Sequence, residues 1–119
     1  MRNLSLLVLR CGNIERAKSF YELFGMAFVK EQHGNGPVHY ACILDQTVFE
    51  IYPAKSPQEV DLTTRLGFAV ENIDEVMRGL QSGEFEVVSP LKTTEWGTRS
   101  VVRDPDGRSV ELYSDGGKE

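Results

Sequence analysis

The feature that most constrains the fold is an internal repeat. The pattern apolar–Glu–apolar–Tyr occurs at 49–52 (Phe-Glu-Ile-Tyr) and again at 110–113 (Val-Glu-Leu-Tyr). Asn-Ile followed by an acidic residue occurs at 13–15 and at 72–74, each time after an apolar segment. Because the two matches have nearly equal offsets, the sequence predicts two copies of one supersecondary unit.

Hydrophobic periodicity predicts the order βαβββ in each copy. In the first copy Asn13 caps a helix, and in the second Asn72 does. The expected helices are 14–23 and 73–81; the expected strands are 4–10, 26–32, 38–44, 47–52, 64–71, 85–88, 98–103 and 108–113. The sequence Asp104-Pro105-Asp106-Gly107 favours a turn between the last two strands.

These elements predict one α+β domain over 1–119, with half-modules 1–53 and 62–115 joined by a linker at 54–61. The expected architecture is two βαβββ modules that form a cupped mixed sheet with the helices on its outer face. The last strand would end at Tyr113 and carry Glu111 between two apolar neighbours, which is unusual for a carboxylate.

Strand alternation predicts which side chains share the inner face. If Asp45-Gln46 is a two-residue hairpin loop, Ala41 lies opposite Glu50 and His39 lies opposite Tyr52. In the second half the matching face is expected to carry Trp96, Thr98, Ser100, Val102, Ser109, Glu111 and Tyr113. A face that mixes polar and apolar side chains predicts a ligand cavity.

Net charge, apolar runs and cysteine spacing limit the classes of partner and compartment that we expect. The net charge of −5 disfavours nucleic acid and anionic membranes as partners. No apolar run approaches the length of a membrane span. Cys11 and Cys42 lack C-x-x-C spacing, so we expect buried free thiols and a cytoplasmic protein. Arg99, Arg103 and Arg108 are expected to be solvated.

The paired modules, the Phe20-Tyr21 helix end and Asp-Pro-Asp-Gly followed by Val-Glu-Leu resemble the vicinal oxygen chelate superfamily. This superfamily includes glyoxalase I, bleomycin-resistance proteins and extradiol dioxygenases. The resemblance covers nearly the whole chain and implies the fold. It implies the function less sharply, because the superfamily carries several chemistries on one scaffold.

In glyoxalase I and its relatives, four inward side chains hold a divalent metal. Carried over position by position, the resemblance places these ligands at Leu6, Glu50, Arg65 and Glu111. Leu cannot ligate a metal, and Arg stays protonated. We therefore expect no metal at this position, and instead a Glu50–Arg65–Glu111 network in a partly dry cavity. The network is either a structural ion-pair cluster or a catalytic one.

The function expected from these residues is binding of a small organic molecule without the usual metal. The alternatives are a glyoxalase I-like lyase or isomerase using Ni, Zn, Mn or Co, with His39 as a displaced ligand, and a structural module. Catalysis, if any, is assigned to the two glutamates. Ligand contacts are assigned to Arg10, Arg65, His39, Tyr52, Trp96 and Tyr113. We expect His39 to be a hydrogen-bonded residue of the cavity wall rather than a displaced metal ligand, and we expect His33 to be solvated. A homodimer is expected, because each half-module leaves an open cup.

Overall fold

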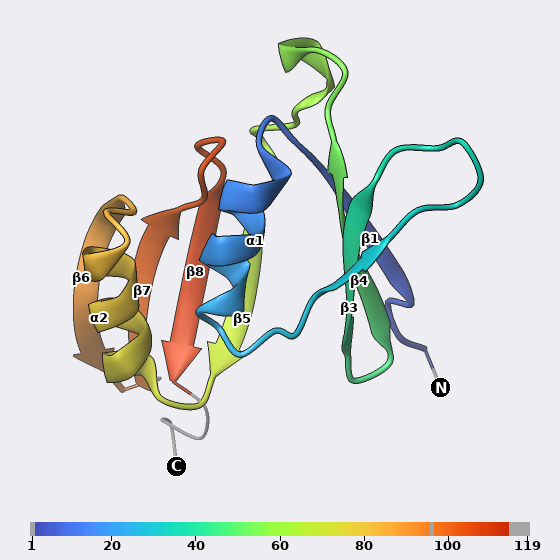
Figure 1. Ribbon diagram of the computed structural model, residues 1–119. Coiled ribbons are helices and arrows are strands. Elements are labelled where there is room, and N and C mark those ends of the chain that lie inside the picture. Colours follow the sequence, from blue (N-terminus) through green and yellow to red (C-terminus); the bar gives the residue numbers. More distant parts are fainter. Residues whose placement is uncertain (1, 96, 115–119) are drawn as a thin grey trace. The chain divides into compact units, whose positions relative to one another are not determined.

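The computed structural model describes residues 2–95 and 97–114. The chain divides between Asp61 and Leu62 into two compact units (Figure 1). Each unit contains one helix longer than a single turn and one four-stranded mixed sheet. The predicted α+β class and the repeated βαβββ module are confirmed.

Unit 1 has strand order β1-β4-β3-β2, in which β1 runs parallel to β4 and the other pairs are antiparallel. A short 3-10 helix, η1, lies in the segment that follows the sheet. The elements are β1 (Leu6–Cys11), α1 (Ile14–Glu22), β2 (Val29–Glu31), β3 (His39–Leu44), β4 (Thr47–Pro53) and η1 (Pro57–Glu59).

Unit 2 repeats this topology with strand order β5-β8-β7-β6, and β5 is parallel to β8. Figure 1 shows α2 covering one face of this sheet. The elements are β5 (Leu66–Val70), α2 (Ile73–Ser82), β6 (Val87–Thr94), β7 (Gly97–Arg103) and β8 (Ser109–Ser114).

Both predicted helix caps are confirmed. The Asn13 Oδ1 accepts a hydrogen bond from the Arg16 backbone N–H at 3.0 Å, and the Asn72 Oδ1 accepts one from the Glu75 N–H at 3.2 Å. Each bond satisfies one backbone N–H that has no partner inside the helix.

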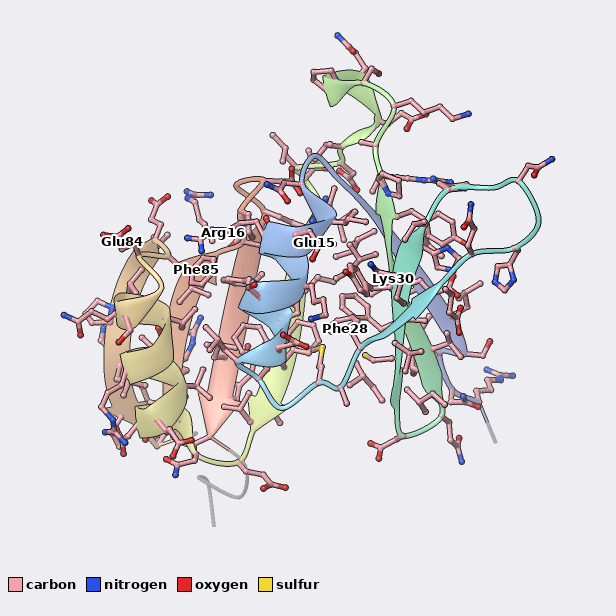
Figure 2. All side chains as sticks on the ribbon, in the orientation of Figure 1. Glu15, Arg16, Phe28, Lys30, Glu84 and Phe85 are labelled. Carbon is pink, nitrogen blue, oxygen red and sulfur yellow. The ribbon has the colours of Figure 1, made fainter. Side chains whose placement is uncertain are left out.

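The helix α1 buries an aromatic stripe against one face of the first sheet. Its Tyr21 ring meets the Phe49 ring of β4 edge-on, with centroids 5.2 Å apart. Glu15, labelled on α1 in Figure 2, accepts a 2.6 Å hydrogen bond from the Tyr40 hydroxyl of β3. Phe28, labelled just before β2, packs on Phe49, and their ring centroids are 6.0 Å apart. Phe49 and Tyr40 therefore face the helix, so their neighbours in the strands face the other way.

The largest error of the sequence prediction concerns β6. A strand over 85–88 that ends before Pro90 was expected, whereas β6 runs through Pro90 to Thr94. Proline is tolerated because β6 is an edge strand and its pairing with β7 shifts register around Ser89. The expected strand 26–32 is correspondingly too long, since only Val29–Glu31 pairs.

The expected solvation of Arg108 is also wrong. Its side chain is 1% exposed, and its Nη1 lies 2.6 Å from Oδ2 of the fully buried Asp104 carboxylate. The Asp104 Oδ1 also accepts hydrogen bonds from the backbone N–H groups of Asp106 and Arg108. The Asp-Pro-Asp-Gly turn is thus built around a buried ion pair. Both cysteines are buried and free, as predicted.

In the part of the chain that the structure describes, no helix is long and apolar enough to cross a membrane.

Candidate functional site

The face of the first sheet that points away from α1 carries aligned rows of side chains. The middle row consists of Val8, Glu50, Ala41 and Val29, which are paired across β1, β4, β3 and β2 in that order. The predicted pairing of Ala41 with Glu50 is therefore confirmed. Glu50 is half-buried, and among the described residues no cation forms a salt bridge with its carboxylate.

An open groove of about 450 Å³ lies over this row within unit 1. Its lining is mostly apolar, with two carboxylates: Ala27, Val29, Glu31, Ala41, Cys42, Ile43, Val48 and Glu50. Ile43, which lies near the end of β3 beside the hairpin turn, is 75% exposed, which is unusual for a large aliphatic side chain. Burial raises the pKa of the Cys42 thiol to about 11, so this cysteine stays a neutral thiol at neutral pH.

A second row, at the end of the sheet, is aromatic and charged. It runs from Arg10 to Tyr52 across β1 and β4, and from His39 to Glu31 across β3 and β2. The His39 and Tyr52 rings stack at 4.0 Å with planes 10° apart, which fits the predicted position of His39 opposite Tyr52. The Arg10 guanidinium lies 4.9 Å from the centroid of the Tyr52 ring, a cation–π distance.

Two histidines converge on Glu31. The Nε2 of His39 lies 3.3 Å from Glu31 Oε1, and the Nε2 of His33 lies 3.6 Å from the same oxygen. His39 is 1% exposed and its Nδ1 lies 3.2 Å from the Pro37 carbonyl oxygen, whereas His33 is 73% exposed. These three side chains could hold a metal ion, since their ligand atoms lie within 4.8 Å of one another.

In unit 2 the site centres on Glu111. Its carboxylate pairs with the Arg65 guanidinium, lies 3.3 Å from Nη2 of Arg99, and accepts a hydrogen bond from the Tyr113 hydroxyl. The Tyr113 hydrogen bond chiefly, with help from both arginines, lowers the pKa of Glu111 below its ordinary value. The same hydrogen bond raises the pKa of Tyr113, because the neighbouring carboxylate favours the protonated phenol.

These contacts bear on the metal-ligand positions that the resemblance implies. In unit 2, Glu111 faces two guanidinium groups, which have no lone pair to donate, and in unit 1 Leu6 offers none either. That no metal binds at these positions stays a prediction. The Arg65 side chain is 66% exposed, so its environment is wetter than the sequence prediction assumed.

The structure brings some predicted site residues together within each unit. Arg10, His39 and Tyr52 form one group in unit 1, and Arg65, Glu111 and Tyr113 form another in unit 2. The predicted Glu50–Arg65–Glu111 network joins the two units and stays a prediction. Trp96 lies outside the described residues.

Sequence reasoning missed Glu31 and Arg99 as members of these groups. The predicted face of β7 was wrong by one residue: Ser100 and Val102 pair with Leu112 and Val110, whereas Arg99 pairs with Tyr113 and so lies on the Glu111 face. The sequence signal was weak for Glu31, because the long loop between β2 and β3 does not define which residue of β2 pairs with His39.

Comparison with known proteins agrees with this architecture. The family model of the Glyoxalase/Bleomycin resistance protein/Dioxygenase superfamily matches residues 3–112. Among curated proteins, none matches the sequence.

Solved structures share the fold over nearly their whole length. TnmS3, an antibiotic binding protein from a Streptomyces species, has 23% identity and a TM-score of 0.73, with 96% of each chain covered. A glyoxalase-related enzyme from Fulvimarina pelagi has 23% identity and a TM-score of 0.72, covering 98% of this chain and 90% of that one. The oxidase ChaP-H2 has 11% identity and a TM-score of 0.77, covering 99% and 98%. The chain therefore belongs to the glyoxalase/bleomycin resistance protein/dioxygenase superfamily.

Proposed function

We propose that this protein binds a small organic molecule in the groove of unit 1, without a metal at the position used by glyoxalase I. The observation that carries the proposal is the groove itself, whose volume of about 450 Å³ falls within the usual range for small-molecule sites. The antibiotic-binding relative TnmS3 supports the same class of function.

The lining indicates the chemistry of the ligand. Val29, Val48 and Ile43 offer apolar surface, while Glu31 and Glu50 offer carboxylate oxygens, which only accept hydrogen bonds. No described cation neutralises Glu50. The best-matched ligand therefore has a flat or aliphatic apolar body and a basic or hydrogen-bond-donating group.

The alternative, a glyoxalase I-like lyase or isomerase, needs a metal among Glu50, Glu111 and two further ligands. Arg65 and Arg99 occupy the Glu111 carboxylate, and Leu6 supplies no donor. The chemistry of this donor set favours the binding function over the lyase.

A thermal-shift screen tests the proposal with aromatic and aliphatic amines, each paired with a neutral analogue of equal size. A ligand at one hundred times its Kd stabilises the native state by about 2.7 kcal/mol, which such an assay detects. We expect each amine to raise the melting temperature more than its neutral analogue does. Glu50→Gln should weaken amine binding about tenfold, equal to about 1.4 kcal/mol, and leave the neutral analogues nearly unchanged.

Ala41→Leu should abolish binding of both members of each pair, because the larger side chain fills the groove floor. Glu86→Gln is the matched control, since Glu86 is exposed, lies in unit 2 and pairs with Arg103 at 3.5 Å. Hits that bind Ala41→Leu as well as they bind the parent would refute the groove as the binding site.

A further inference from the structure

We propose that Glu31, His33 and His39 form a binding site for a divalent transition-metal ion such as Zn²⁺. The site lies at the junction of β2, β3 and the loop between them, within unit 1, and uses none of the four family metal positions. It does not depend on the proposed ligand groove.

Hydrogen bonding sets which nitrogen of the neutral His39 ring carries the hydrogen. The Pro37 carbonyl oxygen can only accept a hydrogen bond, so the Nδ1 of His39, 3.2 Å away, must be the donor. In the neutral ring the Nε2 then carries a lone pair, and it faces Glu31 Oε1 at 3.3 Å. Two acceptors at this distance repel each other unless a cation lies between them. That cation is either a second ring proton or a metal ion.

The position of His33 favours the metal ion. Its Nε2 points at the same Glu31 oxygen from 3.6 Å, so two imidazole nitrogens converge on one carboxylate. Without a metal, each histidine needs its own hydrogen on Nε2 to satisfy its contact with Glu31. A metal ion serves all three groups at once, and histidine nitrogen with carboxylate oxygen is a common donor set for Zn²⁺.

Two of the three distances between the ligand atoms fit such an ion, and all three atoms lie within 4.8 Å of one another. With Zn–N and Zn–O bonds of about 2.0–2.2 Å, neighbouring ligand atoms of a tetrahedral site lie about 3.4 Å apart. The two distances to Glu31 Oε1, 3.3 and 3.6 Å, bracket this value. Three protein ligands leave a fourth position open for water or another ligand.

The surroundings hold the ligands in place. A metal-binding histidine commonly donates its other ring N–H to a carbonyl or a carboxylate, as His39 does to Pro37. The Tyr52 ring, stacked on His39, fixes the plane of the imidazole. The turn that carries His33 is closed by the Gly36 N–H, which donates to the His33 carbonyl oxygen at 2.9 Å. Glu31 also lines the groove, so the ion would lie at its rim.

Titration with Co²⁺ and Zn²⁺ tests the proposal on the full chain, by absorption spectroscopy and calorimetry. We expect one ion per chain and Co²⁺ bands typical of nitrogen and oxygen ligands. Glu31→Gln and His33→Gln should each raise the Kd about tenfold or more. His33 is 73% exposed, so this variant should keep its fold, which circular dichroism verifies.

Glu50→Gln and Glu111→Gln are the matched controls, and both should leave the Kd unchanged. Loss of binding in either control would overturn the proposal in favour of the family metal position. Absence of binding by the parent would overturn it as well.

Discussion

Replacing Arg108 with Met should severely destabilise unit 2. Arg108 and Asp104 have side chains that are 1% and 0% exposed, and their 2.6 Å contact lies at the base of the turn between β7 and β8. Methionine keeps most of the buried volume but removes the charge. The Asp104 carboxylate keeps two backbone hydrogen bonds, at 3.0 Å each, and loses its guanidinium partner.

The magnitude follows from the burial of both partners. Breaking a buried ion pair by removing one partner costs about 3–5 kcal/mol, because the remaining charge is left uncompensated. Arg103 in the same hairpin provides the contrast. It is 42% exposed and lies 3.5 Å from Glu86, an arrangement worth about 0–1 kcal/mol. Arg103 also donates a hydrogen bond to the Gly107 carbonyl oxygen, a contact that adds about 0.5–1.5 kcal/mol.

Urea unfolding followed by circular dichroism measures the two variants side by side. Arg108→Met should lose about 3–5 kcal/mol of unfolding free energy, and Arg103→Met about 2.5 kcal/mol or less. Adding Asp104→Asn to Arg108→Met should recover part of the loss, because no charge then remains buried. Equal losses for Arg108→Met and Arg103→Met would refute the buried ion pair.

Three further predictions concern unit 2 and the assembly. Arg65→Ala should cost about 1 kcal/mol or less in urea unfolding, because Arg65 is largely exposed and Arg99 still faces Glu111; a loss above about 3 kcal/mol would mean that the pair is buried. Tyr113→Phe should raise the pKa of Glu111, because it removes the main cause of the lowering. The lowered pKa of Glu111 stabilises the parent at neutral pH, and this stabilisation is lost as the pH falls through that pKa. The unfolding free energies of the parent and of Tyr113→Phe should therefore converge in acid; a difference that grows in acid would contradict this. Light scattering should give about twice the chain mass of 13.4 kDa, and a monomer mass would count against the homodimer.

The fold could be predicted because local signals agree with each other. The repeated Glu-x-Tyr pattern gave the two modules, and Asn13 and Asn72 marked the helix starts. The two-residue loop at Asp45-Gln46 fixed the register that places Ala41 opposite Glu50. Pro90 misled the prediction because a proline indicates a strand end only when the strand is not at a sheet edge.

The candidate site was less predictable because it depends on contacts across loops and on burial. Arg108 was expected in solvent because arginine usually is, and only the turn geometry brings Asp104 against it. Glu31, His33 and His39 are brought together by a loop whose shape no periodicity encodes. Arg99 belongs to the Glu111 group because it lies opposite Tyr113 in the second sheet, as His39 lies beside Tyr52 in the first.

The most direct test of the proposed function is ¹H–¹⁵N NMR titration of the protein with the strongest amine from the thermal-shift screen. We predict saturable shifts concentrated on the groove residues of unit 1, above all Val29, Ala41, Ile43 and Val48, and their loss in Ala41→Leu. Shifts that leave these residues unchanged and map to unit 2 instead would contradict the assignment of the ligand to this groove.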